Sequence, residues 1–266
     1  MIRRVFAIML ACLAFSAGAL AQDKLGVIVL HGKQGRPGQN QGLSVIASNL
    51  QSAGAKVVQP ATPWDRGAWE TINLTVEQVL AQLDGYAGQL RAQGASRIVV
   101  IGHSLGACVG LAYAVERANL AGLVMLAPGH SVGGGGRRRG SGDLNKDVDR
   151  ARALIDQGKG NEIMSGSDFN QGNTITMTVR AAIYYAWHDP DGLASMGNEA
   201  PRLPATTPLL VVVGEGDPIS GRAEGLIYKP AAKNPYSRYV TNGAGHLETP
   251  MASSKVTTDW VLGLPR

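Results

Sequence analysis

The sequence predicts an α/β protein with a mostly parallel sheet flanked by helices on both faces. Residues 25–30 (LGVIVL), 97–101 (RIVVI) and 208–213 (PLLVVV) are almost continuously apolar. Such runs are typical of parallel strands, because helices cover both faces of the sheet and bury every side chain. Segments with apolar residues at helical spacing separate these runs, and strands that alternate with helices form parallel sheets.

The remaining elements follow from the same two patterns. Gly54 ends the first predicted helix and Pro60 follows the second predicted strand, since both residue types interrupt regular structure. In chain order we expect strands at residues 25–30, 55–58, 97–101, 123–127, 208–213 and 237–241. We expect helices at residues 43–53, 71–93, 105–119, 146–157 and 253–262.

Residues 129–207 break this alternation. The segment opens with glycines at 133–136 and arginines at 137–139, which cannot pack a core, and we expect the arginines to be solvated. It also holds an aromatic group at 184–187 (YYAW), which either packs inside the segment or lines a substrate pocket; packing is favoured. His188 is expected to lie in a turn. We interpret the segment as an insertion that forms a lid or loop region over the functional site.

The N-terminus has the pattern of a signal peptide. Residues 1–21 combine a short basic start, an apolar stretch and an Ala-Leu-Ala site before Gln22. The apolar stretch is too short for a comfortable membrane span. We therefore expect cleavage near Ala21, no stable membrane insertion, and a mature domain of residues 22–266 that is periplasmic or secreted.

Charge and cysteine content exclude several functions. The formal net charge of +5 becomes +3 once Arg3 and Arg4 leave with the signal peptide, and no basic run is interleaved with aromatic residues. Nucleic acid is therefore not an expected partner. Cys108 is the only thiol of the predicted mature chain, so no internal disulfide can form. The five histidines lack ligand partners at metal-binding spacing, and we expect neither a metal nor another cofactor.

The pattern Gly-His-Ser-x-Gly occurs twice, at residues 102–106 and 129–133. This pattern can form the strained strand-to-helix turn that exposes a serine nucleophile, but only between a strand and a helix. Ser104 has that setting, since the strand at 97–101 precedes it and a helix follows at once. Four glycines and three arginines follow the second copy, and glycine disfavours a helix. We therefore assign the nucleophile to Ser104 and not to Ser131.

At this point the sequence resembles the α/β-hydrolase fold, over residues 25–128 and 205–266. Three further motifs support the resemblance in chain order. His31-Gly32-Lys33-Gln34-Gly35 is similar to the loop that follows an early strand in that family. Asp217 in GEGDP follows a late buried strand, and His246 in GAGH follows the last strand.

The resemblance implies a catalytic triad of Ser104, His246 and Asp217. His246 would be the base, and Asp217 would hold its imidazole in the required tautomer. Glu215 and Asp191 are weaker candidates for the acid. The oxyanion would be held by the backbone N–H groups of Lys33, by resemblance, and of Leu105, at the start of the helix after Ser104.

Two further groups of residues follow strands near this site. His31 and His103 are expected to brace the site and not to transfer protons. Residues 63–66 (PWDR) lie at the carboxyl edge of the sheet, where ligands bind in such folds, and could shape the substrate pocket.

The sequence therefore predicts an exported serine hydrolase that cleaves a carboxylic ester or a related acyl bond through an acyl-enzyme. The substrate would be a small-molecule or lipid-like acyl compound. The same triad would serve thioester or amide hydrolysis, and these alternatives stay open. A non-catalytic binding protein on the same fold is a further alternative, because a fold does not fix a function.

Overall fold

The computed structural model describes residues 24–117, 119–128, 132, 142–170, 172–217, 220–231 and 233–265. Its centre is a six-stranded parallel sheet with the order β2-β1-β3-β4-β7-β8. The strands are β1 (Leu25–Leu30), β2 (Lys56–Val58), β3 (Arg97–His103), β4 (Gly122–Leu126), β7 (Leu209–Gly214) and β8 (Arg238–Asn242). The predicted fold class is thereby confirmed.

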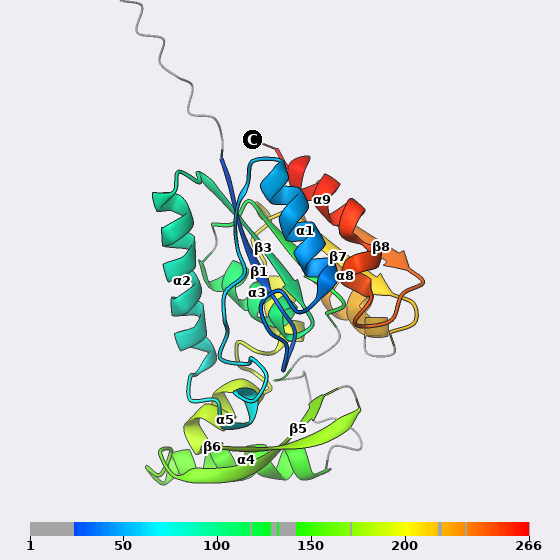
Figure 1. The fold of residues 1–266 in the computed structure, drawn as a ribbon. Coiled ribbons are helices and arrows are strands. Elements are labelled where there is room, and N and C mark those ends of the chain that lie inside the picture. The colour runs from blue at the N-terminus through cyan, green and yellow to red at the C-terminus, as the bar shows by residue number, and fades with distance from the viewer. Residues whose placement is uncertain are drawn as a thin grey trace, which may run out of the picture.

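Helices cover both faces of this sheet (Figure 1). The longer ones are α1 (Gln41–Ser52), α2 (Val76–Ala92), α3 (Leu105–Arg117), α4 (Gly142–Asp156), α5 (Ala181–His188) and α9 (Ser254–Leu262). The shorter turns of helix are η1 (Trp69–Thr71), α6 (Met196–Glu199), η2 (Ala200–Arg202), η3 (Ser220–Arg222), η4 (Glu224–Tyr228), α7 (Lys229–Ala231) and α8 (Thr249–Ala252).

The side chains on each face of the sheet pack into a separate hydrophobic cluster. Along β1, Val27 and Val29 pack with residues of α1 and α9. The alternate residues Ile28 and Leu30 pack with residues of α2 and α3. Successive side chains of a strand point to opposite faces, so a continuous apolar run is required wherever both faces are covered.

The predicted start of the second helix is wrong. The chain forms η1 at 69–71, and α2 begins only after Thr75. The Thr75 hydroxyl accepts a hydrogen bond from Gln78 N (3.2 Å), and the Gln78 side chain accepts one from Thr75 N (2.8 Å). This reciprocal capping box fixes the helix start. Leu74 therefore lies outside the helix, where its carbonyl accepts a hydrogen bond from Trp187 Nε1 (2.8 Å).

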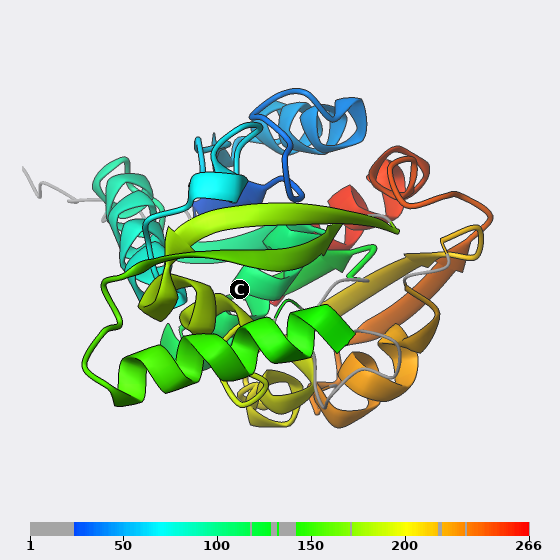
Figure 2. The same cartoon turned by 90° about the horizontal axis from the view of Figure 1, so that it is seen from below.

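The segment between β4 and β7 holds more structure than the one predicted helix. After α4 come two antiparallel strands, β5 (Ile163–Asn170) and β6 (Asn173–Arg180), which form a separate hairpin. Figure 1 shows this hairpin with α4 and α5 below the end of the sheet toward which β1 runs. Seen from below, the hairpin crosses in front of the sheet (Figure 2). The segment therefore lies beside the carboxyl ends of the strands.

Some of the sequence predictions concern residues outside this description. They are the signal peptide at 1–21, Ser131 of the second Gly-His-Ser-x-Gly copy, and the arginines at 137–139. Among the residues that the structure does describe, no helix has the length and apolar character needed to cross a membrane.

Candidate active site

Ser104 lies on a strained turn between a strand and a helix. β3 extends through His103, and α3 begins at Leu105. Ser104 has a φ of 54°, in the left-handed region that non-glycine residues rarely adopt. Its N–H donates a hydrogen bond to Leu126 O at the end of β4 (3.0 Å). The turn is therefore tied to the neighbouring strand, and the surrounding structure maintains its strained backbone.

Two glycines make this turn sterically possible. A Cβ atom at Gly102 would lie 2.2 Å from Gly106 O. A Cβ atom at Gly106 would lie 2.6 Å from Leu30 O and 2.7 Å from His31 O. These neighbours are backbone atoms and cannot rotate away. The spacing of the two glycines around Ser104 is therefore a steric requirement of the turn.

The structure brings His246 and Asp217 together. His246 Nδ1 lies 2.6 Å from Asp217 Oδ2. A carboxylate oxygen accepts, so Nδ1 carries the proton and Nε2 is left to accept one. The Asp217 side chain is fully buried and that of His246 is 10% exposed. The alternative acid Glu215 is exposed, and Asp191 lies in an exposed turn after α5.

Backbone hydrogen bonds hold the two loops that carry this pair. Glu215 N donates to Asn242 O (2.6 Å), and Gly216 N donates to Ala244 O (3.0 Å). A Cβ atom at Gly214 would lie 2.2 Å from Ala244 O, so the two chains meet closely. The loops after β7 and β8 thus form one unit, and the pair does not depend on side-chain contacts alone.

His103 connects this unit to the Ser104 turn. Its Nε2 donates a hydrogen bond to His246 O (3.0 Å), and the two imidazole rings lie 5.0 Å apart. Burial, and then the neighbouring His246, lower the pKa of His103 from 6.5 to about 4. The His103 imidazole is therefore uncharged near neutral pH. Its hydrogen bond to His246 O braces the loop that carries His246, which is the kind of role expected from the sequence.

The loop after β1 forms the opposite wall of the site. His31 Nε2 lies 2.7 Å from Asp65 Oδ1, and Trp64 Nε1 donates to His31 O (3.0 Å). None of residues 63–66 lines the pocket that contains Ser104, so their predicted part in shaping it is not direct. Trp64 is fully buried and holds the loop after β1 from behind. A Cβ atom at Gly32 would lie 3.1 Å from Ser104 Cβ, which places the loop directly beside the serine.

The two residues predicted to supply oxyanion donors are reached from Ser104 in different ways: Leu105 follows it in the chain, and Lys33 lines the same pocket. Lys33 is in the loop just described, and Leu105 is the first residue of α3. The first N–H groups of a helix have no acceptor within the helix, and the helix dipole favours negative charge there. The start of α3 therefore favours negative charge beside Leu105.

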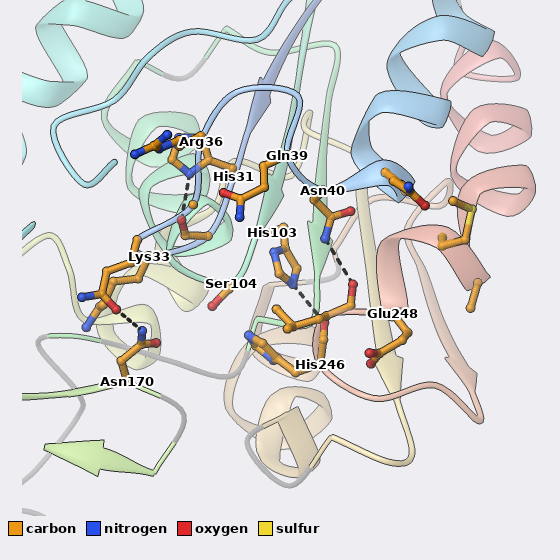
Figure 3. A pocket seen from close by; sticks show the side chains of 18 residues that line it. His31, Lys33, Arg36, Gln39, Asn40, His103, Ser104, Asn170, His246 and Glu248 are labelled. Atoms are coloured by element: carbon orange, nitrogen blue, oxygen red, sulfur yellow. Dashed lines mark hydrogen bonds between the residues drawn. The ribbon is translucent and has the colours of Figure 1, made fainter. Parts of the chain in front are cut away.

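A pocket of about 760 Å³ opens beside Ser104. Figure 3 shows Ser104, His103 and His246 around it. Leu247 and Met251 provide its apolar part and are 52% and 42% exposed. Sequence reasoning missed most of the polar lining, which includes Gln34, Arg36, Gln39, Asn40, Gln41, Asn170 and Glu248. A cavity of this size and mixed lining is typical of small-molecule sites.

The aromatic group of the inserted segment packs in the core. Tyr184 and Trp187 are fully buried, and Trp187 lies edge-on to Trp69 with 5.1 Å between ring centroids. Tyr184 stacks on His188 inside the segment, as favoured, whereas Trp187 packs on residues outside it. The expectation that His188 lies in a turn is wrong, because it is the last residue of α5 and is buried.

Cys108 is predicted to be chemically inert. The thiol is buried on α3 and donates to Ala194 O (3.3 Å), and burial raises its pKa to about 12. A thiolate is the reactive form, so the native protein should not react with a thiol reagent over an hour, whereas the unfolded protein should react at once. Cys108→Ala should keep most of the wild-type activity. Rapid labelling of the native protein would contradict the burial of this helix face.

The low pKa of His103 predicts a pH-dependent stability. The unfolded chain protonates this histidine below about pH 6.5, whereas the folded protein does so only near pH 4. Acid therefore favours unfolding, and His103 should remove about 2 kcal/mol of unfolding free energy between about pH 7.5 and about pH 5. Urea unfolding of wild type and His103→Gln at both pH values tests this. Equal losses in the two proteins would contradict it.

The comparisons with known proteins agree with this fold. A family model described as Alpha/beta hydrolase family matches residues 27–257. A comparison with curated protein sequences gave no match.

Three solved structures with the same fold have low sequence identity to this chain. A monoacylglycerol lipase of Paleococcus ferrophilus is 18% identical, with a TM-score of 0.61, over 90% of this chain and 95% of its own. A carboxyl esterase of Bacillus coagulans is 16% identical, with a TM-score of 0.60, over 91% of each chain. Est1E of Butyrivibrio proteoclasticus, solved with ferulic acid, is 16% identical, with a TM-score of 0.60, over 93% of this chain and 92% of its own. With the family match over most of its length, the chain belongs to the alpha/beta hydrolase family and is a hydrolase of that fold.

Proposed function

We propose that this protein is an exported serine hydrolase that cleaves a carboxylic ester through a Ser104–His246–Asp217 triad. The observation that carries the proposal is the 2.6 Å contact between His246 Nδ1 and Asp217 Oδ2, in a site where His246 lines the same pocket as Ser104. The strained backbone of Ser104 supports its assignment as the nucleophile, because such strain is concentrated at functional residues.

The reaction would proceed in two halves. Ser104 Oγ attacks the carbonyl carbon while His246 Nε2 takes the hydroxyl proton, and Asp217 stabilises the imidazolium that forms. The N–H groups of Lys33 and Leu105 donate to the oxyanion. The imidazolium then protonates the leaving alcohol, and an acyl-enzyme remains. Water, deprotonated by His246, attacks that acyl group, and the acid product and Ser104 are released.

An ester is the preferred substrate on the basis of the similar structures and the pocket. The solved proteins of the same fold include a lipase and a carboxyl esterase. The pocket combines apolar side chains with amides and charges, which suits a molecule with an acyl chain and a polar part. Thioester and amide substrates would use the same attack on a carbonyl carbon. A panel of matched ester, thioester and amide substrates with one acyl chain would separate these three reactions.

Substitution of the two motif serines tests the nucleophile. Ser104→Ala should lower kcat for an activated ester by a factor on the order of 10⁴ or more, as loss of a triad nucleophile does in other enzymes. Ser131→Ala should change the rate by a few-fold at most, because its glycine-rich surroundings disfavour the helix that the strained turn requires. A dead Ser131→Ala variant beside an active Ser104→Ala variant would refute the triad.

A fluorophosphonate probe separates an enzyme from a binding protein. The wild-type protein should form a covalent adduct on Ser104, found by mass spectrometry of the labelled peptide, because an activated serine attacks phosphorus as it attacks a carbonyl. Ser104→Ala is the matched control and should stay unlabelled. Absence of any adduct would favour a non-catalytic binding protein.

Export is tested separately from catalysis. The small-x-small site before residue 22 predicts a mature chain that begins at Gln22, in the periplasm or outside the cell. N-terminal sequencing of the protein from a periplasmic or culture-medium fraction should give Gln-Asp-Lys-Leu. An uncleaved N-terminus on cell-associated protein, or a lipid-modified Cys12, would show that the export assignment is wrong.

A further inference from the structure

The side chain of Lys33 does not reach into solvent. It is 2% exposed, and its Nζ pairs with Asp168 Oδ2 of β5 and also donates to Phe169 O (3.1 Å). The ammonium group lies 4.6 Å from the centroid of the Trp69 ring. A lysine is almost never this buried unless it is paired, so the contact with Asp168 compensates a large desolvation cost.

Asp168 is the centre of a buried polar cluster. Its side chain is 1% exposed. Besides Lys33, its Oδ2 accepts a hydrogen bond from Trp69 Nε1 (2.7 Å), and its Oδ1 lies 3.5 Å from His188 Nε2. These four residues come from the loop after β1, from η1, from β5 and from α5. One carboxylate therefore joins the candidate site to the inserted segment.

The next residue of the loop makes a second connection to the same hairpin. Gln34 has a φ of 58°, and its N–H donates to Trp64 O (2.9 Å). Its side chain donates to Glu70 and accepts a hydrogen bond from Asn170 Nδ2 (2.7 Å). Figure 3 shows Asn170 facing this loop from the hairpin. Two successive loop residues are thus fixed to residues 168–170 at the end of β5.

We propose that the Lys33–Asp168 ion pair sets the position of the oxyanion donor at Lys33. The inference rests on the proposed function, in which the backbone N–H of Lys33 stabilises the oxyanion. A donor of this kind acts only when it is held at the right point beforehand, and displacements of about 1 Å are costly. The Lys33 side chain and Asp168 are positioning residues, and through them the hairpin β5–β6 supports catalysis by holding the loop after β1.

The alternative is that the pair serves stability alone. Removal of one partner leaves a buried charge without compensation, and this destabilises a fold wherever the pair lies. Stability measurements therefore cannot separate the two roles. The two roles are distinguished by measuring kcat of the folded variants. A displaced oxyanion donor lowers kcat because it weakens transition-state binding more than substrate binding.

The experiment compares Lys33→Met and Asp168→Asn with wild type on one activated ester, at a temperature where circular dichroism shows each variant folded. Both substitutions remove the charge and keep a similar shape. We expect kcat to fall by at least about 10-fold in each, with KM within about 3-fold of wild type. The double variant should be no worse than the more impaired single variant, because both changes remove the same interaction.

Two further variants serve as controls for the effect of the buried ion pair on kcat. Lys255→Met breaks an exposed ion pair with Asp259 (2.5 Å; side chains 88% and 60% exposed) and should leave kcat unchanged. Asn170→Ala removes the second, partly exposed connection and keeps the buried charges paired, so it remains informative if a charge variant fails to fold. It should lower kcat by a few-fold. Unchanged kcat in folded Lys33→Met, Asp168→Asn and Asn170→Ala would overturn the inference.

Hydrogen exchange distinguishes failure of this inference from failure of the proposed function. Lys33→Met should speed amide exchange in residues 163–170, and Asp168→Asn should speed it in residues 31–36, because each partner holds the other segment. Exchange that stays local to each substitution would overturn the positioning role, even in an active enzyme. A wild-type protein without ester hydrolysis or a Ser104 adduct would refute the proposed function, whereas reciprocal exchange changes would still support the anchoring of the loop.

Discussion

The close packing of backbone around Ser104 is the constraint on which the rest of the site depends. The serine keeps a φ of 54° because β3 ends in the middle of the sheet, where its neighbours β1 and β4 hold it on both sides. Because residues 102 and 106 are glycines, no Cβ atom at either position collides with the backbone where α3 follows β3 directly. The start of α3 is therefore placed beside the serine, and a helix start is where negative charge is favoured.

Each of the other site residues is carried by a loop at the same edge of the sheet. Parallel strands end at one edge, so the loops after β1, β3, β7 and β8 meet there although they are far apart in sequence. Backbone hydrogen bonds join the last two loops, and His103 joins them to the serine turn through His246 O. A neutral His103 suits this role, because its Nε2–H donates to a carbonyl without placing a second positive charge beside His246.

The inserted segment completes the site from the other side. Its hairpin meets the loop after β1 through a buried ion pair and through an amide hydrogen bond. Members of one fold family share the sheet edge and differ in such insertions, since loops tolerate change more readily than the core. In this protein the insertion contacts the loop that carries Lys33, so its effect on the reaction would operate through the backbone of that loop.

The sequence by itself determined the sheet, the strand-to-helix turn at Ser104 and the residues that meet beside it. Continuous apolar runs and helical spacing are local signals, and Gly102, Ser104 and Gly106 require only their own strand and helix to be recognised. The motif around Asp217 follows the buried strand β7, and the motif around His246 follows the partly exposed edge strand β8. The parallel topology that brings the two motifs together could therefore be predicted as well. The capping residues Thr75 and Gln78 were a local signal too, and they would have given the correct start of α2.

Tertiary structure decided the inserted segment and the environment of Lys33. The alternation in residues 173–180 and Gly172, with a φ of 84°, are signals of a hairpin, but the pattern is short, and many of its side chains are polar. Lys33 and Asp168 are 135 residues apart, and neither has a local pattern that predicts a buried pair. Burial of a charge depends on what packs around it from distant segments, and that is set only when the hairpin, η1 and α5 meet on the loop after β1.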